Sequence, residues 1–243
     1  MLRGLPRQMA VVAGLLIMLG LNLGLGADPA DLAGEGRTGV YARYPNAFAP
    51  HPFTFAIWLP IFAGAAALTI VQARPARRLD AVLDAAGPWA AAAFGLVGLT
   101  ALTPLGLSNV VVALALGASL AALAAARPCA RGADRWLVRA PLGLLAGWLV
   151  VATALNLCQL AVMLGVTIGP AVAAVLMIGA GLAGMAITRR SGEPAAVLAL
   201  IWAGAGILAA HPEEVAIWLG LSGMILAIIQ KNYPEGKIRQ NIV

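Results

Sequence analysis

Eight long uncharged runs constrain this chain more than any other feature of its sequence. Most are close to the roughly 20 residues that an α-helix needs to cross a hydrocarbon layer about 30 Å thick. The chain is 61% hydrophobic and only 11% charged, a balance that soluble domains do not approach. The sequence therefore predicts an all-α, polytopic transmembrane helix bundle. Its expected spans are residues 8–25, 53–73, 88–104, 108–126, 140–164, 170–188, 194–210 and 215–230.

The positions of the 16 basic residues orient these spans. All except Arg37 and Arg43 lie in alternate gaps between spans or near the two ends of the chain, whereas the acidic residues divide evenly between the two sides. Loops rich in Lys and Arg remain in the cytoplasm. We therefore expect both termini to be cytoplasmic, because seven or nine spans would leave a basic loop outside. In this setting the net charge of +6 indicates membrane topology rather than binding to nucleic acid.

The first run has a second interpretation. Arg3 and Arg7 precede an apolar stretch that ends in the small residues LGLGADPA, as in a cleaved secretory signal. The run is about as long as a full span, which favours a retained helix, and cleavage stays the alternative.

The run at 50–72, PHPFTFAIWLPIFAGAAALTIVQ, carries an unusual set of aromatic side chains. Two prolines flank a histidine at its outer entry, and three aromatic residues follow at intervals of three and four, which places them on one helix face. A helix that contacts only lipid does not need such a face. We interpret it as one wall of a site for a flat, hydrophobic molecule. The candidate contacts are Pro50, His51, Phe55, Trp58 and Phe62.

The fifth run combines an indole with amides. Trp148, Asn156 and Gln159 share one helix face, and Thr153 lies beside them. An amide without a partner in hydrocarbon costs several kcal/mol, so these groups are expected to meet protein, ligand or trapped water. They either contact a ligand or tie two helices together, an interaction worth about 0.6 to 2 kcal/mol. The sequence leaves both roles open. If they contact a ligand, Trp58 and Trp148 should meet over a shared site.

Two stretches resemble one known family. FAPHPFTFAIWLPIFAGAAALTIVQ is similar to the Pro-rich loop and second helix of the translocator proteins, also called tryptophan-rich sensory proteins or TspO/MBR. The stretch from Pro141 to Asn156 resembles the family's fifth helix, in which a Trp is followed by small residues and then, at plus eight, by Asn. The stretch AAAAFGLVGLTALTP of the third run departs from the family, because it lacks the Gln, Asn and Trp that the family's third helix usually carries.

The resemblance implies a five-helix bundle over 1–164, with the external loop 26–52 as a lid, and a three-helix C-terminal extension over 165–243. Family members bind tetrapyrroles and sterol-like molecules. It therefore implies a bacterial inner-membrane receptor or carrier for a hydrophobic small molecule, with a porphyrin-like or haem-like compound as ligand and no required cofactor.

The residue types absent from the eight runs argue against other classes of function. They contain no paired carboxylates, no activated nucleophile, no phosphate loop and no metal-ligand cluster, so we do not expect an enzyme. A secondary transporter is disfavoured because no run holds a charge at mid-depth. The main alternative is a non-catalytic structural or assembly subunit of a larger membrane complex. The candidate protein partners are such a complex or, in a homodimer, a second copy of the chain. Cys129 and Cys158 lie near opposite sides of the membrane, which argues against a disulfide.

Overall fold

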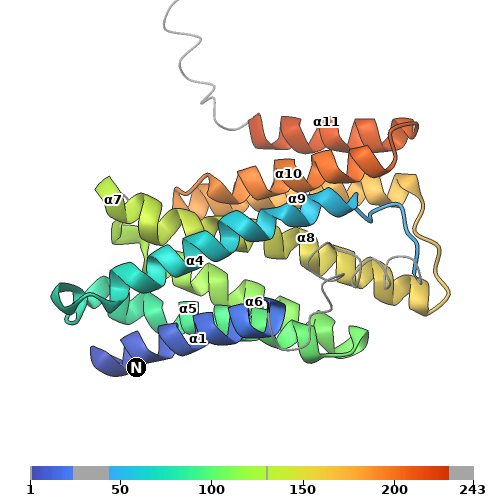
Figure 1. Cartoon of the computed structure of the whole chain (residues 1–243). Helices are drawn as coiled ribbons and strands as arrows, with labels where there is room; N and C mark the ends of the chain where they lie inside the picture. Colours follow the sequence, from blue (N-terminus) through green and yellow to red (C-terminus); the bar gives the residue numbers. More distant parts are fainter. Residues whose placement is uncertain (1, 24–43, 130, 230–243) are drawn as a thin grey trace, which may run out of the picture.

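The computed structural model describes residues 2–23, 44–129 and 131–229, and all regular secondary structure in these ranges is helical. The long helices run roughly along one axis, with α1 on one side of the bundle and α11 on the opposite side (Figure 1). The apolar helices are α1 (Leu5–Leu23), α4 (Trp58–Ala73), α5 (Ala81–Leu99), α6 (Leu105–Ala125), α8 (Ala140–Met163), α9 (Pro170–Ser191), α10 (Ala195–Ala210) and α11 (Val215–Ile229). Short helical turns connect them: η1 (Pro52–Ile57), η2 (Pro75–Arg77), η3 (Thr100–Leu102), η4 (Arg127–Cys129), α7 (Gly132–Asp134) and the π-helical η5 (Arg135–Arg139).

Six of these segments are long and apolar enough to cross a membrane. Helices α10 and α11 are shorter, with 16 and 15 residues, or about 24 and 22 Å. The prediction of an integral membrane protein built as a helix bundle is confirmed. These two helices lie on the same side of the bundle, so the apolar helices are shortest on that side.

Small residues set the spacing between neighbouring helices. Helix α1 packs on α5, α6 on α5 and α8, and α10 on α8. A Cβ on Gly14 would lie 2.6 Å from the carbonyl oxygen of Ala91, and one on Gly147 would collide with the carbonyl of Ala196. Close backbone approach of this kind is how helices gain packing energy in a membrane, where lipid is as apolar as leucine.

Arginines from several helices and loops lie together at one end of the bundle. Arg7 lies 3.5 Å from Asp84, and Arg77 lies 2.9 Å from Asp80 and 2.7 Å from Asp134. Other arginines at this end bond to backbone: Arg127 donates to the carbonyl of Arg190, and Arg139 to that of Ser191. The basic gaps thus lie together, as the alternating arrangement requires.

The structure corrects two helix boundaries at this end. Helices α1 and α5 begin earlier than predicted and include Arg7 and Asp84, so the uncharged runs do not mark the helix ends. Asp80 starts α5 by accepting bonds from Val82 N and Leu83 N. Burial alone would raise the pKa of Asp80, but the bonds from Leu83, Arg77 and Val82 outweigh burial and lower the pKa.

Both cysteines are free and buried, in agreement with the expectation that they do not pair. Burial raises the pKa of the Cys129 thiol, which lies in η4 outside the spans. A thiol of this kind is a weak nucleophile.

The aromatic run also begins differently from the prediction. Phe55 belongs to the 3₁₀ turn η1, and the α-helix starts only at Trp58. Pro60 has no N–H to bond the carbonyl of Ala56, so an α-helical pattern cannot extend through the Pro52–Ile57 segment unchanged. The division at residue 164 stays a prediction, and most of the predicted lid, residues 26–43, lies outside the described part of the chain.

Candidate functional site

Four of the predicted aromatic residues form one cluster between η1, α4 and α8. The ring of Trp148 on α8 lies edge-on to Trp58, with 6.0 Å between centroids, and edge-on to Phe55, at 5.9 Å. Phe62 stacks on Trp58 at 5.3 Å, one turn further along α4. The two indoles from separate spans therefore meet, which was the geometric condition for a shared site. We call Phe55, Trp58, Phe62 and Trp148 the aromatic cluster.

The indole of Trp148 is buried with its polar atom unused. Only 2% of the residue is exposed, and its Nε1 has no hydrogen-bond acceptor among the described residues. An N–H group without a partner in an apolar interior costs free energy, so most buried indoles do bond an acceptor. This donor is available to an acceptor atom of a bound molecule or to a water.

The polar residues that follow Trp148 are arranged less simply. The Thr153 hydroxyl donates to Leu149 O at 2.7 Å within its own helix. The Asn156 amide donates to Ser108 Oγ at 3.4 Å, which links α8 to α6, and Gln159 is buried. Asn156 thus ties α8 to α6, which is one of the two roles that the sequence had left open.

The entry residues lie against α10 instead of the indoles. His51 N donates to Gly206 O at 2.9 Å, and Phe53 N donates to His51 Nδ1 at 3.4 Å. The imidazole is exposed and makes its ring contact with Phe53, at 5.0 Å. Pro50 is buried next to it. Within the described residues, Pro50 and His51 therefore belong to the contact with α10.

Sequence reasoning missed the residues that hold this contact. Trp202 Nε1 donates to Thr54 O at 2.7 Å, and the Trp202 ring meets Phe53 edge-on at 5.6 Å. Thr54 is fully buried against Gly206, where a Cβ would collide with it. A single Trp and a Gly in an Ala-rich helix gave little signal, because the partner lies almost 150 residues away in the sequence.

The chemistry of the cluster follows from its four aromatic side chains. Its members offer ring faces and edges and two indole N–H groups, of which that of Trp148 is buried without an acceptor, and none of the four side chains ionises near neutral pH. Such a surface suits a planar apolar molecule with one or two hydrogen-bond acceptors.

These features define a class: a polytopic α-helical membrane protein with an aromatic cluster between its second and fifth spans. A family model described as TSPO-like protein matches residues 8–231. The chain belongs to this TSPO-like family, and the match extends through the last three helices. No curated protein and no solved structure matches the chain.

Proposed function

We propose that this membrane protein is a receptor or carrier for a flat hydrophobic ligand of the tetrapyrrole type, in the bacterial inner membrane. The observation that carries the proposal is the unpartnered Trp148 Nε1 inside a cluster of four aromatic rings. A macrocycle supplies the ring area to stack on Trp58 and Phe55, and its carboxylate or carbonyl groups supply an acceptor for the indole N–H.

The proposal requires the rings to move apart. Trp148 already contacts Phe55 and Trp58, so the ligand must displace one ring and take over its contacts. Trp58 is the ring that can move, because it is only partly buried whereas Trp148 is enclosed. We expect the association rate to lie below the diffusion limit and to rise with temperature, because a ring must first be displaced.

Porphyrin titration of the purified protein, followed by the shift of the porphyrin absorption band, tests the function. Trp58→Ala and Trp148→Ala should each weaken binding about tenfold or more through lost stacking. Trp148→Phe keeps one six-membered ring but removes the pyrrole ring with its N–H, so its loss should be smaller than that of Trp148→Ala, about threefold to tenfold. Trp218→Ala, at an exposed indole on α11, is the control and should bind like the wild type. Equal affinity of all four variants, or no binding by the wild type, would refute the proposal.

A second function, as a structural subunit of a larger membrane complex, is favoured by the contacts that the cluster makes without a ligand. Its four rings contact one another without a ligand, and Asn156 already bonds Ser108. Purification in a mild detergent distinguishes the two. A stable protein partner and no pigment support the subunit, whereas a monomer or homodimer that carries a coloured small molecule supports the receptor.

A further inference from the structure

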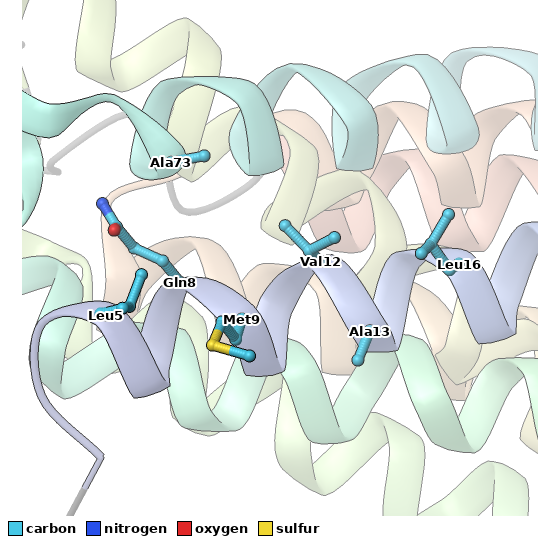
Figure 2. Close-up of a pocket in the computed structure, with 7 residues that line it drawn as sticks. All are labelled: Leu5, Gln8, Met9, Val12, Ala13, Leu16 and Ala73. Atoms are coloured by element: carbon cyan, nitrogen blue, oxygen red, sulfur yellow. The ribbon is translucent and has the colours of Figure 1, made fainter.

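A groove separate from the aromatic cluster lies on the membrane-facing side of α1. It has a volume of about 350 Å³ and runs along one side of α1 to the end of α4. Figure 2 shows Gln8 directed towards Ala73 on α4, and Val12 and Leu16 following it along the same side of α1. No residue of the lining is charged. The lining residues are Leu5, Gln8, Met9, Val12, Ala13, Leu16 and Ala73.

The length of the groove matches one leaflet of a bilayer. From Leu5 to Leu16 the helix rises about 16 Å, close to half of the roughly 30 Å hydrocarbon thickness. Helix α1 continues to Leu23, but the groove does not. An acyl chain, which occupies a single leaflet, fits this extent. A helix from a second copy would cross both leaflets and would continue along the remaining turns of α1.

Gln8 ties the two helices together about one turn from the polar end of the groove, where Leu5 lies. Its Nε2 donates to Gln72 O at 2.7 Å and to Arg74 O at 3.3 Å, and Gln72 Nε2 donates back to Gln8 O at 3.3 Å. This exchange holds the start of α1 against the end of α4. The groove is therefore built by side-chain bonds between two helices, and its polar end has a defined position.

Three arginines at that end have free side chains. Arg74 follows the groove residue Ala73, and Arg3 lies two positions before Leu5. Arg78 lies beside Gly4, because a Cβ added to Gly4 would be 3.9 Å from the Cγ atom of Arg78. All three are exposed, and their guanidinium groups make no hydrogen bond or ion pair with any residue that the structure describes. The two other arginines nearby are used internally. Arg7 pairs with Asp84, and Arg77 with Asp80 and Asp134.

We propose that this groove is a binding site for one anionic phospholipid of the cytoplasmic leaflet. One acyl chain lies between Leu5 and Leu16, and the phosphate lies among Arg3, Arg74 and Arg78. The charge of the headgroup complements guanidinium groups that the fold leaves unpaired, and juxtamembrane basic residues attract anionic lipid. This site is independent of the aromatic cluster and of any porphyrin.

Native mass spectrometry of the purified protein tests the site. The protein is titrated in detergent with a phosphatidylglycerol and, separately, with a phosphatidylcholine of the same chains. We expect one phosphatidylglycerol to bind more tightly than the others, and phosphatidylcholine to bind at least tenfold more weakly. Glycerol phosphate, which carries the headgroup charge without chains, should not compete at millimolar concentration.

Substitutions separate the chain contact from the charge contact. Ala13→Phe fills the groove at an exposed position and should abolish the tight site, while Ala113→Phe, on the exposed side of α6, should leave it intact. Arg74→Gln should weaken binding about fivefold. Arg189→Gln makes the same charge change on α9, at the same end of the bundle, and should have no effect.

Three results would overturn the proposal. Equal retention of both lipids would show that headgroup charge is not recognised. Unchanged binding in Ala13→Phe and Arg74→Gln would place the lipid elsewhere. A lipid-free wild-type dimer that Ala13→Phe converts to a monomer would assign the groove to a second copy of the chain.

Discussion

At the scale of single residues, the glycines that let helices pack closely matter as much as the large aromatic side chains. Gly147 lies one position before Trp148 and faces the backbone of Ala196 on α10, so α8 and α10 approach closely next to the aromatic cluster. Gly143, one turn earlier, faces Glu193 and Ala195 in the same way. The two glycines set the helix spacing that brings α10 within reach of η1.

Substitution of Gly147 by alanine should therefore destabilise the protein. A Cβ would overlap the Ala196 carbonyl, and forced separation of packed elements costs about 1 to 3 kcal/mol. Unfolding in increasing fractions of dodecyl sulfate, followed by circular dichroism, measures the change. Gly179→Ala is the matched control because no atom lies within 4 Å of its Cβ position, and it should be neutral or stabilising by up to about 1 kcal/mol. Equal stability of the two variants would show that this contact does not limit the helix spacing.

At the scale of elements, helix α10 supports the segment that carries the aromatic residues. It contacts η1 through Trp202 and Gly206 and contacts α8 through Ala196. Because η1 leads directly into α4, these contacts orient Phe55 and Trp58 relative to Trp148. One of the last three helices thus packs on η1 and α8, two of the three elements that build the cluster.

Trp202→Phe tests this supporting role. The variant keeps a ring against Phe53 but removes the 2.7 Å bond to Thr54 O, a loss of about 0.5 to 1.5 kcal/mol. Amide hydrogen exchange in residues 52–57 should become about threefold to tenfold faster, without any ligand present. In Trp218→Phe, where Nε1 bonds Pro212 O on the α10–α11 turn, exchange in 52–57 should not change. Identical exchange in both variants would mean that α10 does not restrain η1.

At the scale of the whole molecule, the two ends of the bundle differ in chemistry. One end holds ion pairs and arginine bonds to helix carbonyls, and the other holds aromatic contacts around η1 and α10. Since basic loops stay inside, the arginine end is expected to face the cytoplasm and the aromatic end the outside.

Cysteine labelling in intact cells checks this orientation. In a background without Cys129 and Cys158, His51→Cys should react with a membrane-impermeant maleimide, because residue 51 is exposed at the outer end. Arg131→Cys, exposed between α6 and α8, should react only after the cells are permeabilised. The reverse pattern would invert the topology and would place the proposed lipid site in the outer leaflet.

The sequence alone determined the membrane-embedded helical class, the alternation of basic gaps and the two runs that carry the aromatic and polar faces. These properties depend on the composition and periodicity of single runs, since each span must satisfy its own backbone in lipid. Arg7 and Asp84 show the limit of that reasoning: a charge can enter a helix when a partner some 80 residues away accepts it, so the uncharged runs ended too early. Only the tertiary structure decided that Asn156 bonds Ser108, that Trp202 holds Thr54 and that a groove follows α1, because each depends on which helices become neighbours.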